Sequence, residues 1–413
     1  MCKIVVCVPT YKRIDLIKEF LETQVEIYKK YNIDIWIYDS NETNECQELV
    51  NIYKKIYDNI FYISIPSSTH SNQKVMRIYE GYDRNKDYDY VWLSQDAYRI
   101  TDNELCDIVN KVKKQYDIIT ISNDDNMCIG NKEYFNILEY FRDTAWKLTG
   151  YGNCIVKTST MINDVDWKYI EDKYLAKDCI NYSHVGYYFE QLLKINNPKM
   201  YFKHVNDGEY YWSELKKHSA WVKDTFHIIC DVWPALVNKI PSYYDTYKND
   251  VIKSLGVNAS ILTYRKFIYL RKSDIYNKYI YEHYKGLWNQ FCDVDESFLS
   301  RLANVLPCEV ISLEQERVLN FCKNYKYIYI YGCGKISKEV VDILKSINIG
   351  WKAFFISGKS EQSCLDNHKI LKFDKMLLNE NVGIIMGLSY KNYNEVIKKY
   401  NLYDYQEQLL KMY

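Results

Sequence analysis

The chain has 413 residues, with 54 Lys and Arg balanced by 54 Asp and Glu and a hydrophobic fraction of 47%. This length predicts two or three domains, and the composition excludes long disorder. A formal net charge of zero gives no global attraction to polyanions, so nucleic acid is not an expected partner.

No apolar run approaches the roughly 18 to 20 residues needed to span a bilayer. We expect no signal peptide, because a strand-like run starts at Lys3. The 13 cysteines are scattered and contain no Cys-x-x-Cys pair, so they indicate neither a disulfide framework nor a zinc site. We therefore expect a cytoplasmic protein, with a place at the inner face of the membrane as a second option.

The first 120 residues alternate strand-like and helix-like patterns. An apolar run at 3–8 precedes apolar side chains at helical spacing, namely Ile14, Ile17, Leu21, Val25 and Tyr28. Further strands are expected at 33–38, 60–65, 90–93 and 117–121, with a helix at 73–83. The alternation predicts an α/β fold with a mostly parallel sheet that helices cover on both faces.

Beyond residue 121 the pattern changes twice. Residues 122–210 are irregular, 211–322 read as helical, and a smaller Rossmann-like α/β unit follows, with strands at 327–331, 351–356 and 382–386 and a helix at 336–347. We expect three domains, at 1–210, 211–322 and 323–413.

Glycine is scarce, and four of the 14 glycines lie in two Gly-x-Gly steps, Gly150-Tyr151-Gly152 and Gly332-Cys333-Gly334. Such steps are typical of loops that need a positive φ or the close approach of another group.

Polar side chains follow three of the expected strands. Residues 9–13 come after the first strand, 39–41 after the second and 94–96 after the fourth. Ligands of open parallel sheets bind at the carboxyl ends of the strands, so these residues predict a binding site. The alternative is that Asp39 and Asp96 are solvated loop carboxylates.

Three segments, Val6–Arg13, Ile37–Asn41 and Val91–Asp96, together resemble the GT-A glycosyltransferases, and in particular the large inverting family 2 group. The first segment matches that family's strand ending in Pro-Thr-Tyr-x-Arg, and the last matches its Asp-x-Asp region. The resemblance covers roughly residues 3–210. It implies a GT-A-like domain that transfers a sugar from a nucleotide-sugar donor, with a UDP-sugar favoured.

The resemblance also implies roles for single residues. Asp39 would accept a hydrogen bond from the base or ribose, and Asp96 would ligate Mn²⁺ or Mg²⁺ as the second acid of Asp-x-Asp. The first acid is Ser94 here, which weakens the case for a metal. The donor-binding residues expected on this basis are Pro9, Thr10, Tyr11, Arg13, Asp39, Lys74, Arg77, Ser94, Gly152 and Asn153.

Lys74 and Arg77 lie on the helix before the fourth strand, where a cation can meet a phosphate. The alternative for both is a solvent-facing helix cation. Gly152-Asn153 resembles the family's Gly-Gly-Asn loop near the donor sugar and acceptor.

Inverting transfer needs a general base for the acceptor hydroxyl. Glu190 is the first candidate, Asp178 the second and Glu171-Asp172 the third, each with an exposed structural carboxylate as the alternative. His204 follows a strand-like run and is a candidate metal ligand, with a hydrogen-bonded loop histidine as the alternative.

Residues 265–285 carry six cations against two acids, with interleaved tyrosines. They predict either a peripheral contact with a membrane or polyanionic acceptor, or a solvated helical face.

The run from Tyr327 to Ser337 resembles a dinucleotide fingerprint, but Ser337 replaces its third glycine. The acid expected after the next strand is also absent, because Ser357 follows Ile356. We expect a scaffold or regulatory role for this unit.

The leading hypothesis is a glycosyltransferase that acts on a glycan, lipid-linked or polyol-phosphate acceptor in bacterial surface polysaccharide biosynthesis. Two alternatives stay open: a non-catalytic protein that binds sugar nucleotides, and an NAD-dependent oxidoreductase that acts through the C-terminal unit. The sequence leaves a homo-oligomer open.

Overall fold

The structure is a computed structural model that describes residues 2–81, 88–122, 129–176, 180–206, 208–215, 220–358 and 363–412. The described chain divides into two compact units, a first unit that ends at Ile252 and a second unit that begins at Lys253. The division falls inside helix α10 (Asp245–Asn258). The arrangement of three domains, at 1–210, 211–322 and 323–413, stays a prediction.

The first unit contains a mixed sheet in which, among the described residues, eight strands take part. Their spatial order is β3 (Ile60–Ser64), β2 (Asp34–Asp39), β1 (Ile4–Thr10), β4 (Tyr90–Leu93), β8 (Cys154–Lys157), β6 (Ile118–Ser122), β9 (Met200–His204) and β7 (Lys132–Tyr134). β8 is antiparallel to β4 and β6, β7 is antiparallel to β9, and the other pairs are parallel. The predicted α/β class with a mostly parallel sheet is confirmed.

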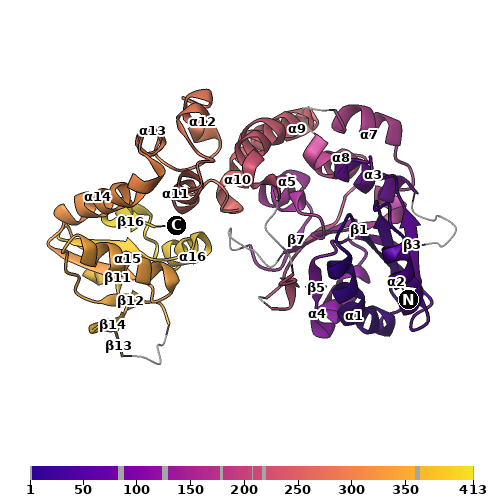
Figure 1. Ribbon diagram of the computed structural model, residues 1–413, viewed down its shortest axis with the longest axis horizontal. Coiled ribbons are helices and arrows are strands. Elements are labelled where there is room, and N and C mark those ends of the chain that lie inside the picture. Colours follow the sequence, from indigo (N-terminus) through magenta and orange to yellow (C-terminus); the bar gives the residue numbers. More distant parts are fainter. Residues whose placement is uncertain are drawn as a thin grey trace. The chain divides into compact units, whose positions relative to one another are not determined.

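Helices cover both faces of this sheet, with α1 and α4 on one side and α3 and α8 on the other (Figure 1). The helices of the first unit are α1 (Ile14–Lys30), α2 (Glu45–Lys54), α3 (Ser71–Gly81), α4 (Asp102–Val112), α5 (Ile137–Thr144), α6 (Thr158–Met161), α7 (Trp167–Tyr174), α8 (Ser183–Leu192), α9 (Trp233–Lys239) and most of α10. A separate antiparallel pair joins β5 (Tyr98–Ile100) to β10 (Tyr210–Trp212).

The core of the first unit confirms the helical periodicity of α1. Ile17 and Leu21 are fully buried and pack in one apolar cluster with Val6 and Val8, which point to the same face of β1. Burial of each such side chain contributes roughly 1.5–3 kcal/mol relative to exposure. The N-terminus of α1 is therefore fixed against the carboxyl end of β1.

The second unit has a smaller sheet in the order β13 (Cys364–Leu365), β14 (His368–Lys372), β12 (Phe354–Ile356), β11 (Tyr327–Tyr331), β15 (Val382–Met386) and β16 (Leu409–Lys411). β13 is antiparallel to β14, and the remaining pairs are parallel. The surrounding helices are α11 (Tyr264–Lys272), α12 (Lys278–His283), α13 (Glu296–Asn304), α14 (Val310–Lys323), α15 (Lys335–Ser346) and α16 (Tyr390–Tyr400).

Two apolar clusters flank the sheet of the second unit, one with α14 and α15 and the other with α16. This agrees with the predicted Rossmann-like arrangement near the C-terminus. The range 211–322 contains α9 to α13 and all but the last residue of α14, while β10 ends inside it at Trp212. None of the helices in the described ranges combines the length and the apolar character needed to cross a bilayer.

The order of strands in the first unit was not predictable from the alternation of elements. The chain builds β1, β2 and β3 outward on one side and then returns to place β4 on the other side of β1. This reversal of direction is the switch point at which open α/β sheets bind ligands. The antiparallel strand β8 then separates β4 from β6, which the short apolar run at 154–156 did not reveal.

Candidate functional site

The register of the strands brings the predicted residues to one edge of the sheet. Thr10, the last residue of β1, pairs with Asp39, the last residue of β2, and Cys7 pairs with Leu93 at the end of β4. The segment from Ser94 to Asp96 therefore runs beside the last residues of β1. The three polar segments found in the sequence converge at the switch point.

Asp96 is bonded across this switch point. The Thr10 hydroxyl donates to one carboxylate oxygen at 2.8 Å, and Arg13 Nη1 contacts the other at 3.2 Å. Asp96 is 2% exposed, and burial raises its pKa against the opposing effect of Arg13. Because Asp96 is buried, the solvated-loop alternative is wrong for it. Burial of a carboxylate is costly unless its charge is compensated, and Thr10 and Arg13 provide that compensation.

Lys74 enters the same edge from α3. Its ammonium donates to the Thr10 carbonyl at 2.7 Å and to the Ser40 hydroxyl at 2.5 Å. Burial lowers the pKa of Lys74 to about 8, although Asp39 and Asp96 both favour its charged form. At 4% exposure, Lys74 is not the solvent-facing helix cation that the sequence left open.

Asp39 is also buried, at 1% exposure, so the solvated-loop alternative is wrong for it too. One carboxylate oxygen accepts the Asn41 backbone N–H at 2.9 Å, and the other accepts the Tyr62 hydroxyl at 3.4 Å. Asp39, Thr10 and Arg13 line one small pocket. The bond from Tyr62 is long, and the thiol of Cys46, which lines the same pocket, also contacts this carboxylate.

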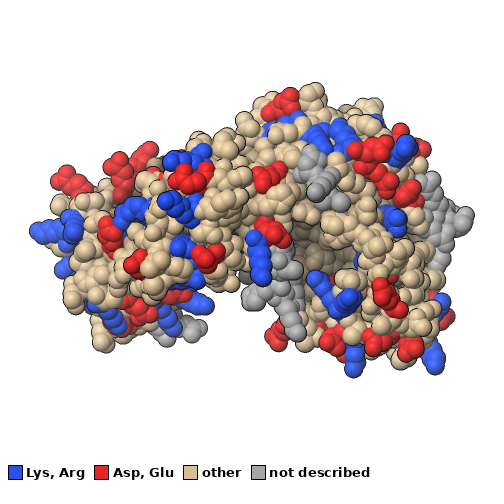
Figure 2. All heavy atoms as spheres, turned by 45° about the horizontal axis from the view of Figure 1, so that its top comes forward, with Lys and Arg blue, Asp and Glu red and all other residues tan. Residues whose placement is uncertain are grey.

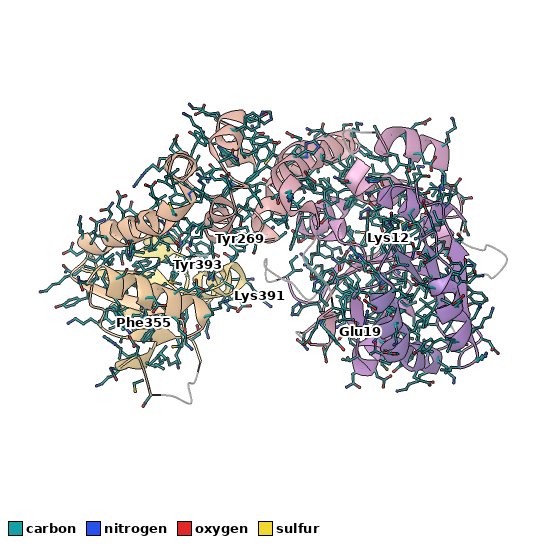
Figure 3. The ribbon with its side chains drawn as sticks, in the orientation of Figure 1. Lys12, Glu19, Tyr269, Phe355, Lys391 and Tyr393 are labelled. Atoms are coloured by element: carbon teal, nitrogen blue, oxygen red, sulfur yellow. The ribbon has the colours of Figure 1, made fainter. Side chains whose placement is uncertain are left out.

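The loop between β1 and α1 forms the rim of this edge. Tyr11 is 44% exposed, and Lys12 takes the left-handed conformation at φ 52° with its ammonium 5.0 Å from the Tyr11 ring. Figure 3 shows Lys12 within the first unit. Pro9 pairs with Tyr38 on β2 and is partly exposed. The predicted wall of Pro9 and Tyr11 is thus available to a ligand.

The Gly150–Asn153 loop lies beyond β4, and it is tightly packed. Gly152 has φ +96°, and a Cβ there would lie 2.5 Å from the Tyr98 ring. Its carbonyl accepts the Tyr210 hydroxyl at 2.7 Å, while the Asn153 amide donates to the Lys147 carbonyl at 3.0 Å. These bonds give Gly152 and Asn153 a structural role, and their contact with a donor stays a prediction.

Two further predicted donor-binding residues, Ser94 and Arg77, have different environments from that of Lys74. Ser94 is 1% exposed, and its backbone N–H donates to the Cys7 carbonyl at 2.9 Å. Arg77 is exposed on the next turn of α3 and donates to the Thr69 hydroxyl at 3.3 Å. The solvent-facing alternative therefore fits Arg77, and its contact with a donor stays a prediction.

The two predicted metal ligands, Asp96 and His204, lie at different parts of the sheet. His204 ends β9, and two strands separate β9 from β4, so about 14 Å of sheet lies between them at roughly 4.8 Å per strand. Within the described ranges, no group of three or more His, Cys, Asp or Glu side chains could hold a metal ion. Asp96 brings one carboxylate, already bonded to Thr10 and Arg13. The metal roles of Asp96 and His204 stay predictions.

Glu190 is buried on α8 at 7% exposure, so the exposed-carboxylate alternative is wrong for it. Its Oε1 accepts the Tyr174 hydroxyl at 2.8 Å and forms an ion pair with Lys173, both from α7. A carboxylate held in this way can be a structural tie between two helices, and its role as a base stays a prediction. Asp178 lies outside the described residues.

The sequence interpretation missed Arg99, a buried cation that bonds the backbone of Asp96. Arg99 is 1% exposed, donates to the Asp96 carbonyl at 2.7 Å and pairs with Glu19 of α1 at 2.7 Å. Arg99 therefore connects the segment after β4 to helix α1. Only its position three residues after Asp96 could have drawn attention to it, because its partners are far away in the sequence.

In the second unit, Ser337 fills the place of the third fingerprint glycine. Its hydroxyl donates to the Gly387 carbonyl at 3.0 Å, and Gly332 takes φ +102° as predicted for a Gly-x-Gly step. The Tyr331 and Ser357 hydroxyls bond each other at 2.6 Å, where an acid would be needed for a ribose. The polar groups of the fingerprint region are therefore bonded to one another.

Acidic side chains compensate most of the positive charge of the segment 265–285. Four of its six cations form ion pairs among the described residues: Arg265 with Glu339, Arg271 with Asp274, Lys272 with Glu314 and Lys285 with Glu282. On the face drawn in Figure 2, positive and negative side chains are interspersed. Membrane contact through this segment stays a prediction.

A scan against protein-family models finds no match to this chain, and a search of curated proteins finds none either. Among solved structures, the chain is similar to S. aureus TarS 1-349, with 12% identity, a TM-score of 0.45, and coverage of 75% of this chain and 83% of that one. It is also similar to the mannosyltransferase PcManGT from Pyrobaculum calidifontis in complex with GDP-Man and Mn²⁺, with 10% identity, a TM-score of 0.39, and coverage of 77% and 87%.

A third similar structure is glucosyl-3-phosphoglycerate synthase from Mycobacterium tuberculosis in complex with Mn²⁺, UDP and phosphoglyceric acid. Here the identity is 9%, the TM-score is 0.38, and the match covers 58% of this chain and 80% of that one. Similarity at this level assigns neither an activity nor a substrate to this chain.

Proposed function

We propose that the first unit is a glycosyltransferase that binds a nucleotide-sugar donor, with a UDP-sugar favoured, at the edge formed by β1, β2 and β4. The observation that carries this proposal is the bond from Thr10 to Asp96 across the switch point, with the buried ammonium of Lys74 beside it. The acceptor would be a glycan, a lipid-linked or a polyol-phosphate group of bacterial surface polysaccharide biosynthesis.

The charges at this edge suit a diphosphate. Lys74 and Arg13 supply two cations, and the N-terminus of α1 directs backbone N–H groups toward the same loop. Asp39 offers the carboxylate oxygen at the long Tyr62 bond as an acceptor for a hydrogen bond from a base or ribose. Pro9 and Tyr11 would form the wall beside that base.

At the anomeric carbon, the transfer forms one bond and breaks one. An acceptor hydroxyl attacks the anomeric carbon, the bond from that carbon to the diphosphate breaks, and the nucleoside diphosphate leaves with the electron pair. The acceptor proton goes to a base, for which Glu190 and Asp178 are the proposed candidates. Attack from the face opposite the diphosphate would invert the anomeric centre. The positive charge of Lys74 and Arg13 stabilises the departing phosphate.

A divalent cation would be held mainly by the diphosphate, with Asp96 as its protein ligand, since the described residues contain no group of three or more His, Cys, Asp or Glu side chains that could hold it. Mn²⁺ or Mg²⁺ would supply Lewis-acid assistance to the leaving group. The protein by itself is therefore expected to bind Mn²⁺ weakly, and calorimetry without nucleotide measures this directly.

The test is a thermal-shift panel of UDP, GDP, CDP, TDP and NAD, each with and without Mn²⁺, because a ligand of the native state raises apparent stability. We expect one nucleoside diphosphate to stabilise the protein, and Asp39→Asn to lower its affinity by about tenfold. Asp58→Asn is the matched control, since Asp58 is exposed in the loop before β3. Stabilisation by NAD alone would refute the proposal.

Turnover then separates the enzyme from a non-catalytic binding protein. A mixture of radiolabelled UDP-sugars and candidate acceptors should yield a labelled product or, without an acceptor, slow release of UDP. Tight nucleotide binding without any turnover of the matching donor sugars would favour the non-catalytic alternative.

A further inference from the structure

The second unit contains a cavity of about 190 Å³ that the proposed transferase chemistry does not use. It lies where α11, α13, α14, α16 and β16 come together, and its charged lining residues are Arg317, Lys411, Asp293 and Asp295. The volume equals that of roughly six liquid water molecules, which is enough for a small organic molecule.

Two cations face this cavity without a carboxylate partner. Arg317 comes from α14 and Lys411 from β16, and neither forms an ion pair within 4.0 Å among the residues described. Burial lowers the pKa of Lys411, the carboxylate of Asp293 opposes this effect, and the positive charge of Arg317 lowers the pKa further. Two like charges held close together in a partly buried cavity are unfavourable unless an anion joins them.

Arg317 is held in place by neutral groups. Its guanidinium stacks on the Tyr264 ring, with the central carbon 3.7 Å from the ring centroid, and its Nη2 donates to the Lys411 carbonyl at 2.9 Å. Its Nη1 contacts the Met412 sulfur at 3.8 Å. Stacking and a carbonyl bond orient the planar fork but leave its charge uncompensated.

Lys411 is similarly placed. Its ammonium lies 5.2 Å from the ring of Tyr393, which Figure 3 labels on α16. The hydroxyl of Tyr264 in the same lining is buried, at 7% exposure of the residue, and burial raises its pKa against the opposing effect of the Arg317 guanidinium. The lining thus places a buried hydroxyl beside Arg317.

The two acids in the lining are already engaged elsewhere. Asp293 pairs with Lys253 at 2.6 Å. Asp295 caps α13 by accepting the backbone N–H groups of Ser297 and Phe298 at 2.7 and 3.2 Å, and these bonds lower its pKa. Asp293 favours the charged form of Lys411, but neither acid forms an ion pair with Arg317 or Lys411 among the residues described.

The remaining wall is apolar, with Val257, Leu262, Val294 and Phe298. We propose that this cavity binds a small organic phosphate, with the phosphate held by Arg317 and Lys411 and the carbon body against the apolar wall. A planar guanidinium fork and a point-charge ammonium together match a dianionic phosphate better than either alone. The site is independent of the donor site in the first unit.

The test is calorimetric titration of the full chain with phenyl phosphate, which combines a dianion with a small apolar body. We expect saturable binding of one molecule per chain, and Lys411→Met should weaken it by about tenfold or more. This variant keeps the apolar stem and removes a side chain that makes no hydrogen bond to a described residue. Arg317→Lys should weaken binding by a similar factor, because it loses the fork and the stack.

Lys323→Met is the matched control, since Lys323 is an exposed cation on the same helix α14 and does not line the cavity. It should leave the affinity unchanged. Inorganic phosphate should bind at least tenfold more weakly and benzyl alcohol not at all. Absence of saturable binding, equal binding of inorganic phosphate, or equal affinity in all variants would overturn the proposal.

Discussion

Lys74→Met should separate the stability of the first unit from its function. The methionine keeps the length and the apolar stem of Lys74 but removes the ammonium that bonds the Thr10 carbonyl and the Ser40 hydroxyl. A pKa of about 8 in place of the ordinary 10.5 means that holding this charge in the fold costs about 3 kcal/mol at neutral pH.

The substitution removes that cost. It also leaves two acceptors without their donor, and this loss destabilises the variant by about 1 to 2 kcal/mol. We therefore expect the free energy of unfolding at pH 7 to be unchanged or up to about 2 kcal/mol higher than that of the wild type. Nucleoside diphosphate affinity should fall by about 10- to 150-fold, the equivalent of one charge-assisted hydrogen bond of about 1.5–3 kcal/mol.

The difference in unfolding free energy between the wild type and Lys74→Met depends on pH with a defined sign. Below about pH 8 Lys74 is charged in both states, and the folded protein bears the full cost. Between about 8 and 10.5 the unfolded chain binds more protons than the folded one, so wild-type stability rises with pH relative to the variant. Urea denaturation of both proteins at pH 7 and 9.5 measures this difference and cancels the shared tyrosine titrations.

Two results would refute this reasoning. One is a loss of several kcal/mol at pH 7 in Lys74→Met, which would show that the ammonium stabilises the unliganded fold. The other is an unchanged affinity for every nucleoside diphosphate that binds the wild type, which would remove Lys74 from the donor site.

Three further substitutions test other parts of the structure. Asp96→Asn should lower donor turnover by at least about 100-fold in a transfer assay while circular dichroism stays unchanged, and full activity would exclude its assigned role. Gly152→Ala should lower the free energy of unfolding by at least about 2 kcal/mol in urea, because its φ is +96° and the new Cβ would strike Tyr98; an unchanged midpoint would contradict this. Ser337→Gly should lose about 1 kcal/mol with its bond to Gly387 and gain no NAD binding in a fluorescence titration. NAD binding after this change would revive the oxidoreductase alternative.

Much of the donor site could be predicted from the sequence, because its members follow strands. Thr10, Asp39 and Asp96 each come at or just after the end of a strand, and in parallel strands those ends share one edge. The periodicity of apolar residues was sufficient to find β1 and α1, whose buried faces agree with it. These are local signals that one stretch of chain carries alone.

The environment of each side chain could not be predicted in this way. Lys74 and Arg77 are three residues apart on α3, yet one is 4% exposed and bonds Thr10, which lies 64 residues away in the sequence, while the other faces solvent. Glu190 is likewise a buried tie to α7, which its own sequence neighbours do not indicate. Such differences arise from the packing of one element on another.

The sequence by itself determined the first strands and helices of the chain and the polar residues at the strand ends, since both follow from short-range pattern. The tertiary structure decided the rest: the placement of β4 beside β1, the burial of the Lys74 charge and the cavity that joins Arg317 to Lys411 across 94 residues of chain. The physical reason is that burial and charge pairing depend on long-range contacts, whose partners a linear pattern does not specify.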